Sequence, residues 1–153
     1  KTPIVKVSMV RGGYNVLSVV TAQGGMAYSI KDATINGSRY IEFLNELFED
    51  RDRPLILLVD HASFHKSKEV RKYVREHRGK LKVFFLPKRA PEYNPDEQVW
   101  NEIKNNSLGK QPIKNKEDLK NRLTEAMDSL RDNMKRIISF FQLPSTKYAS
   151  SIA

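Results

Sequence analysis

The apolar positions of this chain form short continuous runs separated by stretches with helical spacing. The run Leu55–Val59 (LILLV) leads directly into Asp60, and a continuous apolar run is typical of a strand buried on both faces. A second run, residues 81–86, is stopped by Pro87. We therefore expect Asp60 at the carboxyl end of a central strand, where ligands and catalytic groups of open α/β sheets gather.

The first third of the chain predicts a meander of strands followed by a helix. Residues 1–10 alternate and are basic, which indicates an edge strand. Residues 14–22 and 26–30 flank a Gln-Gly-Gly turn, and this pattern predicts an antiparallel hairpin. A helix capped by Ser38 is expected to run to about residue 49 and to pack over the sheet before the next, parallel strand.

A basic helix is expected after the Asp60 strand. Ser67 can cap its start and Gly79 can stop it, with Val70, Tyr73 and Val74 as the buried stripe. Such a basic face is more often solvated than bound to phosphate. The residues of this face are Lys68, Arg71, Lys72, Arg75 and Arg78.

Beyond residue 106 the pattern predicts two further helices. A linker over residues 107–112 precedes a helix capped by Asn115, and a last helical segment covers about residues 132–142. Pro144 ends that segment, and we expect residues 143–153 to fray. With 153 residues and 39% hydrophobic content, the chain is expected to form a single domain.

The composition of the chain indicates a class of binding partner and says little about the fold. Lys and Arg total 27 against 18 Asp and Glu, and the net charge of +9 indicates a polyanionic partner, with solubility as the alternative explanation. The chain has no Cys, which excludes disulfides and thiolate metal sites and fits a cytoplasmic protein. No apolar run has the roughly 18 residues of a membrane span. The chain begins with Lys1, so we expect it to be cut from a longer protein.

The loop after Pro87 delivers a second acidic pair, Asp96 and Glu97, to the start of a helix. Asn94 with Glu97 three residues later fits a capping box, and Pro95 fits the first helical position. From spacing alone, Glu97 could therefore close a helix end or serve as a ligand.

Together these segments resemble a known family. The segment DHASFHKS from Asp60, Leu86-Pro87, and the YNPDE segment that ends at Glu97 and is followed by Val99-Trp100 are similar to the DDE transposases of the mariner type and their bacterial and archaeal insertion-sequence relatives. The resemblance covers roughly residues 1–110. It implies an α/β, ribonuclease H-like domain with a mixed sheet and helices on both faces, in which three carboxylates hold two divalent metals.

Two of those carboxylates carry over to this sequence. Asp60 takes the second acidic position and Glu97 the third, with residues 61–96 between them. His61 stands where the family usually has Asn, and Asp96, a weaker candidate ligand, stands where it usually has an apolar residue. As DNA-binding residues we expect His65, Lys66, Lys88 and Arg89.

The first catalytic Asp of the family has no counterpart here. It lies on the first strand, upstream of the segment that resembles residues 1–3, whereas Asp32 and Asp50 fall after the hairpin and after the first helix. We therefore expect the first strand to be missing, in an N-terminally truncated fragment or a decayed gene product. The helix-turn-helix region that reads transposon ends is also absent, so sequence-specific DNA binding is not expected.

The resemblance implies Mg²⁺ or Mn²⁺, two ions in the intact enzyme, and cleavage and joining of DNA strands. The implied partners are transposon-end and target DNA, with a possible homodimer and no membrane, in the cytoplasm at the nucleoid. The main prediction is thus the incomplete catalytic core of a DNA transposase, an endonuclease by family.

Other interpretations stay open at this point. His61, His65 and Asp60 could form a transition-metal site, and Trp100 could stack on a base instead of lying in the core. The chain could be a non-catalytic module of the same fold that binds nucleic acid or a protein partner. An unrelated α/β domain that binds a small phosphate ligand is disfavoured because no glycine-rich loop joins a strand to a helix.

Overall fold

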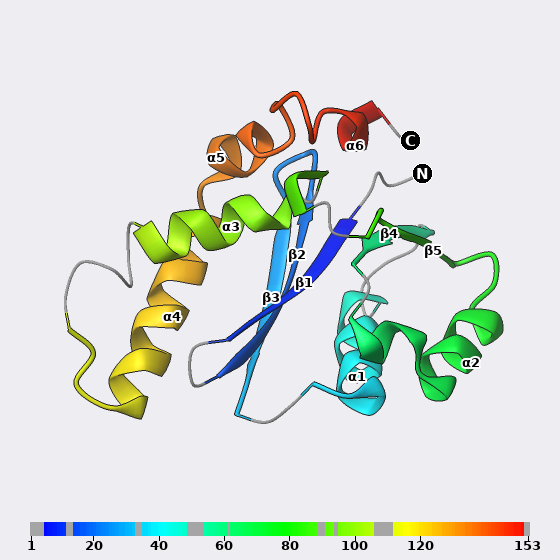
Figure 1. The fold of residues 1–153 in the computed structure, drawn as a ribbon, viewed down its shortest axis with the longest axis horizontal. Helices are drawn as coiled ribbons and strands as arrows, with labels where there is room; N and C mark the ends of the chain where they lie inside the picture. The colour runs from blue at the N-terminus through cyan, green and yellow to red at the C-terminus, as the bar shows by residue number, and fades with distance from the viewer. Residues whose placement is uncertain are drawn as a thin grey trace.

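The chain folds into a five-stranded sheet that lies between two layers of helices (Figure 1). The computed structural model describes residues 5–11, 14–32, 35–48, 54–60, 62–88, 91–93, 95–105 and 112–151. The strand order is β3-β2-β1-β4-β5. The expected α/β class, with a mixed sheet and helices on both faces, is confirmed.

The sheet combines an antiparallel meander with a parallel half. β1 (Val5–Arg11), β2 (Asn15–Thr21) and β3 (Met26–Lys31) are successively antiparallel, and the β2–β3 pair is the expected hairpin. β4 (Leu55–Val59) pairs in parallel with β1 on one side and β5 (Leu81–Phe85) on the other. All five residues of β4 are buried, as their continuous apolar run predicts.

The expectation of an edge strand over residues 1–10 is wrong. Val5–Arg11 lies between β2 and β4 at the centre of the sheet. The absence of the family's first strand, which lies upstream of residues 1–3, stays a prediction. Alternation along a sequence reports which residues share a face, but the number of neighbouring strands depends on distant segments.

One helical layer consists of α1 (Gly37–Phe48), the short 3₁₀ helix η1 (Ser63–Lys66) and α2 (Lys68–Glu76). Ser38 does not cap α1; instead, Oδ1 of Asn36 accepts a hydrogen bond from the backbone N–H of Arg39 at 2.9 Å. α1 therefore begins two residues earlier than a Ser38 cap would place it. The buried stripe of α1 is Tyr40, Phe43 and Leu44.

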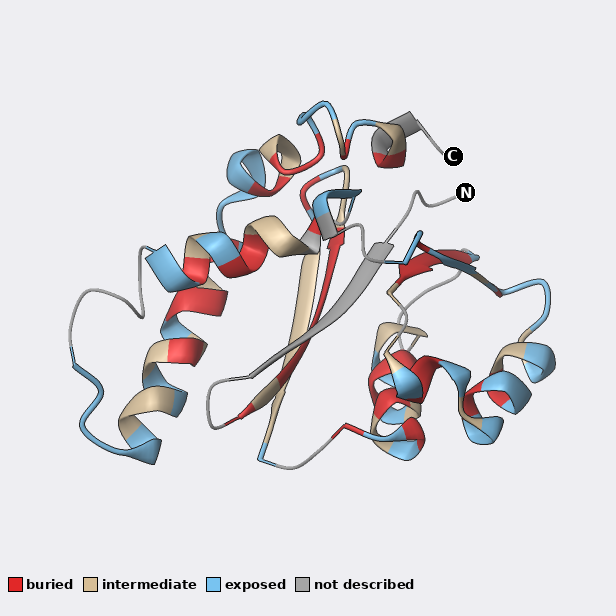
Figure 2. Cartoon of the chain, viewed as in Figure 1, coloured by how far each residue is buried: buried red, intermediate tan, exposed pale blue. Residues whose placement is uncertain are grey.

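Ser67 caps α2 as expected, and its Oγ accepts from the N–H of Val70 at 3.4 Å. Val70 and Tyr73 face the core, while Lys68, Arg71, Lys72 and Arg75 are exposed. Figure 2 shows this division as red and pale blue along the helix.

The other layer contains α3 (Asp96–Ile103), α4 (Lys116–Arg131), α5 (Met134–Ser139) and α6 (Tyr148–Ser151). Asn115 caps α4 as expected, accepting from the N–H of Asp118 at 2.8 Å. Helices of this layer share one core with Ile56 and Leu58 of β4, so β4 has apolar contacts on both faces of the sheet. No helix of the described residues is long and apolar enough to cross a membrane.

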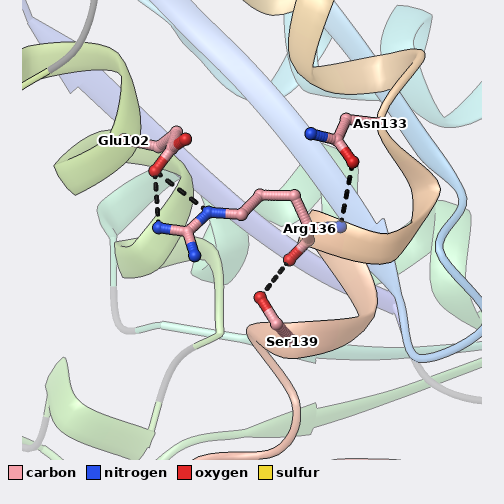
Figure 3. Close-up of polar contacts among 4 residues, drawn as sticks. All are labelled: Glu102, Asn133, Arg136 and Ser139. Carbon is pink, nitrogen blue, oxygen red and sulfur yellow. Dashed lines mark hydrogen bonds and ion pairs between the residues drawn. The ribbon is translucent and has the colours of Figure 1, made fainter.

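A hydrogen-bonded ion pair connects α5 to α3 (Figure 3). Nε and Nη2 of Arg136 donate to Oε2 of Glu102 at 3.2 and 2.8 Å. The backbone N–H of Arg136 donates to Oδ1 of Asn133, which caps α5, and its carbonyl accepts from Ser139. These contacts hold α5 beside the helix that carries Glu97.

The C-terminal segment is packed rather than frayed, which corrects the expectation for residues 143–153 as far as residue 149. Thr146 is fully buried, and its Oγ1 donates to the carbonyl oxygen of Phe140 at 2.6 Å. Tyr148 donates to the carbonyl oxygen of Tyr93 at 2.6 Å, and Ala149 is buried. Two polar side chains of this segment, Thr146 and Tyr148, thus donate to backbone carbonyl oxygens.

Candidate functional site

Asp60 lies directly after β4, at the carboxyl end of an interior parallel strand, as expected. The strand stays paired up to this point, since the N–H of Leu86 donates to the carbonyl oxygen of Val59 at 2.8 Å. Oδ1 of Asp60 accepts a hydrogen bond from the N–H of Ala62 at 2.9 Å. The Asp60 side chain nevertheless keeps 41% of its surface exposed. A carboxylate held in this way can still reach a ligand outside the sheet.

His65 lies against this carboxylate. Its Nε2 is 3.4 Å from Oδ1 of Asp60, and the residue is only 5% exposed. The rings of Phe64 and Tyr40 pack on the imidazole, at centroid distances of 4.2 and 4.7 Å. Because so little of His65 is exposed, its expected contact with DNA stays a prediction. The geometry instead suits a residue that positions Asp60.

Sequence reasoning missed Tyr40. It is 1% exposed, and its hydroxyl has no hydrogen-bond partner among the described residues. Burial raises its pKa above the usual value, and the negative charge of Asp60 raises it further. The phenol is therefore neutral and lies close enough to Asp60 to respond to its charge. Tyr40 shares the buried face of α1 with Phe43 and Leu44, and no motif marks it in the sequence.

Glu97 lies in the first turn of α3 and is half-buried. Pro95 directly precedes the helix with helical dihedral angles, and its carbonyl oxygen accepts from the N–H of Gln98 at 3.1 Å. Asn94, the cap in the alternative interpretation of Glu97, lies outside the described residues, as do His61 and Arg89. The side chain of Asp96 is likewise not described.

The position next to Asp60 in the sheet carries no acid. β1 pairs with β4 up to Val7 and Val59, so the next residues in this register are Ser8 and Asp60. The sequence of β1, VKVSMVR, contains neither Asp nor Glu. Among the described residues, no three His, Asp or Glu side chains cluster closely enough to hold a metal ion. Joint metal binding by Asp60 and Glu97 thus stays a prediction.

The expected DNA-binding lysines are exposed. Lys66 ends η1 with its Nζ 5.7 Å from the ring centre of Phe85, and Lys88 follows Pro87 beyond the end of β5. Trp100, by contrast, is 3% exposed within the core shared by α3 and β2. A role for Trp100 as a base-stacking surface is therefore wrong, and its assignment to the core is confirmed.

Comparisons with known proteins point to one family. A family model described as a DDE superfamily endonuclease matches residues 1–120. A relative from Sinorhizobium fredii (strain NBRC 101917 / NGR234), named uncharacterized protein y4pE/y4sA, is 30% identical over 84 residues. That match covers 55% of this chain and 58% of the relative, so it spans little more than half of the relative's length.

Solved structures give the fold. The catalytic domain of Mos1 mariner transposase is similar with a TM-score of 0.64 and 18% identity, over 92% of this chain and 79% of that one. The same domain in a structure with Raltegravir and Mn matches with a TM-score of 0.64 and 17% identity, over 99% and 86%. The Mos1 paired end complex with Mn matches with a TM-score of 0.63 and 15% identity, over 99% and 57%. The expected ribonuclease H-like fold is confirmed.

Proposed function

Because this chain belongs to the DDE superfamily of endonucleases, we propose that it forms the catalytic core of a DNA transposase and acts through Asp60 and Glu97. In the intact protein this core would cleave DNA phosphodiesters and transfer strands. The observation that carries the proposal is the setting of Asp60. It follows an interior parallel strand, one of its oxygens is fixed by Ala62, and His65 lies beside it while much of the side chain stays exposed.

The donor set suits hard divalent ions. Asp60 and Glu97 offer carboxylate oxygens, the ligands that Mg²⁺ and Mn²⁺ prefer. When bound, two such ions would activate the attacking oxygen and stabilise the leaving oxygen of a phosphodiester. The chain's own part is to supply and orient the carboxylates, with His65 and the Ala62 N–H restricting the rotation of Asp60.

DNA is the proposed substrate, and both transposon ends and target DNA would be bound in the intact protein, in the cytoplasm of a prokaryote. The net charge of +9 and the exposed lysines Lys66 and Lys88 support a polyanionic partner. Binding to duplex DNA should be insensitive to sequence and should weaken steeply with salt, since phosphate contacts release counterions. Binding that does not change between two salt concentrations would contradict this.

Nicking of supercoiled plasmid in Mg²⁺ or Mn²⁺ tests the chemistry. We expect no cleavage by the chain with Ser8, because the register position beside Asp60 lacks a carboxylate. Ser8→Asp should introduce metal-dependent nicking, which Asp60→Asn or Glu97→Gln abolishes. Glu125→Gln, at an exposed position of α4, is the matched control and should leave the nicking unchanged. Strong cleavage by the original chain that survives both catalytic substitutions would refute the assignment.

A second candidate function is a non-catalytic DNA-binding module of the same fold. Among the described residues, no three His, Asp or Glu side chains cluster closely enough to hold a metal ion, and this favours it. A module of this kind would bind DNA equally well in EDTA and in Mn²⁺. It would also gain no nicking from Ser8→Asp, so the same assay separates the two functions.

A further inference from the structure

A cavity of about 460 Å³ opens beside the Asp60 site, between α1, α2 and β5. Its volume falls within the range of roughly 300–1,000 Å³ that is usual for small-ligand sites. Its aliphatic lining comes from all three elements. Leu44, Val70, Val74 and Val83 contribute to this lining.

Aromatic rings make up the side of the cavity nearest Asp60. Tyr40 and His65 are buried there, while Phe85 is 43% exposed. β5 is the last strand of the sheet, so no further strand covers this side of Phe85. The exposed part of the Phe85 ring offers an aromatic surface to a planar group that enters the cavity.

The mouth of the cavity is positively charged. Lys66, Arg71 and Arg75 line it, and no Asp or Glu is among its described lining residues. Arg71 and Arg75 form no ion pair with another described side chain, whereas their neighbour Lys72 lies 3.9 Å from Glu76. Nζ of Lys66 also lies over the Phe85 ring. An apolar and aromatic lining together with three cationic side chains suits a planar base that is linked to phosphate.

The cavity and the Asp60 site share a wall. His65 lines the cavity and places its Nε2 3.4 Å from Oδ1 of Asp60. A nucleotide held in the cavity would thus contact the same imidazole that contacts the carboxylate. No motif in the sequence indicated this arrangement, because Phe85 belongs to an apolar run that predicts a buried strand.

We propose that this cavity binds one unpaired nucleobase of a single DNA strand, with the base stacked on Phe85 and the adjoining phosphates on Lys66, Arg71 and Arg75. This inference rests on the proposed function only in taking DNA as the partner. It assigns no chemistry to the pocket. Its role is to hold an unpaired strand beside Asp60.

Fluorescence anisotropy in EDTA tests the proposal without any need for catalysis. The probes are fluorescein-labelled dT12 and an abasic strand of the same length. We expect the chain to bind dT12 roughly tenfold more tightly than the abasic strand, since stacking stabilises each base substantially. Phe85→Ala should remove this preference while leaving the affinity for the abasic strand unchanged.

Neighbouring residues supply matched controls. Phe84 is 52% exposed but does not line the cavity, and as the adjacent strand residue it points to the other face. Phe84→Ala should therefore keep the preference for dT12. Arg71→Gln should weaken binding of both strands more than Lys72→Gln, which removes the same charge outside the cavity. Thermal unfolding of each variant checks that it folds.

Equal affinity of the unaltered chain for dT12 and the abasic strand would overturn the proposal that the cavity binds a nucleobase. The proposed function would be unaffected. Equal loss of the preference in Phe84→Ala and Phe85→Ala would also overturn the proposal for the cavity, because stacking would then lie elsewhere. If the chain bound no DNA of any kind, both the pocket and the DNA-directed function would fall. Cleavage data from Ser8→Asp do not enter this comparison.

Discussion

Nε2 of His65 lies 3.4 Å from Oδ1 of Asp60, and this contact joins a buried ring cluster to the exposed carboxylate at the end of β4. Residues that contact a metal ligand in this way set its orientation and commonly change metal affinity by roughly 10–100-fold when replaced. His65 is thus a positioning residue in the proposed site.

Substitution of His65 tests that role. His65→Leu should weaken Mn²⁺ binding by about tenfold or more, whereas His65→Gln, which can still donate a hydrogen bond to Asp60, should recover part of the loss. Isothermal titration calorimetry measures both affinities. If the two variants bound Mn²⁺ equally and both unfolded at lower temperature, His65 would have only a structural role.

Substitutions of Tyr40 and Tyr73 are expected to change the free energy of unfolding in opposite directions. The buried hydroxyl of Tyr40 has no partner among the described residues, so Tyr40→Phe should raise the free energy of unfolding by about 1 kcal/mol. The hydroxyl of Tyr73 donates to Oδ1 of Asn45 at 2.8 Å, so Tyr73→Phe should lower it by about 1 kcal/mol. Urea denaturation measures both. Destabilisation by Tyr40→Phe would mean that its hydroxyl has a partner.

The turn between β2 and β3 tests the packing of α5. Gly24 has a φ of +92°, and a Cβ there would lie 2.9 Å from the carbonyl oxygen of Met134. Gly79 has a similar φ of +94° but open space around it. Gly79→Ala should therefore cost about 1–2 kcal/mol from backbone strain alone, and Gly24→Ala should cost distinctly more. Equal losses in chemical denaturation would indicate that α5 does not pack on this turn.

The raised pKa of Tyr28 predicts that the free energy of unfolding depends on pH. Burial, followed by its hydrogen bond to Asp128, raises its pKa from 10.0 to about 12. Because the folded state holds this proton more tightly, the stabilisation is complete below pH 10 and is lost as the pH rises toward 12. The free energy of unfolding should fall more steeply over this interval in the unaltered chain than in Tyr28→Phe. The same pH dependence of the free energy of unfolding in both proteins would contradict the raised pKa of Tyr28.

Local patterns predicted most elements of the fold. The continuous run of β4, the glycine turn between β2 and β3, and the caps Ser67 and Asn115 were all recognisable, because each depends on nearby residues. The central place of β1 was not, since the order of strands is set by contacts with β2 and β4 that are distant in sequence.

The candidate site was predictable in part. The position of Asp60 follows from the strand that precedes it, and the resemblance to the family made Glu97 a candidate ligand. The burial of His65 and the cavity beside it depend on how Tyr40 and Phe85 pack from two other elements. No spacing rule connects residues 40, 65 and 85, so only the fold brings them together.

Electron paramagnetic resonance of free Mn²⁺, titrated with the 153-residue chain, tests the central claim most directly. If Asp60 and Glu97 share a metal, Asp60→Asn, Glu97→Gln and the double variant should lose Mn²⁺ binding to the same extent, while the exposed-site control Glu125→Gln binds like the unaltered chain. Binding that persists in the double variant, or that depends on Asp60 and not on Glu97, would contradict the account.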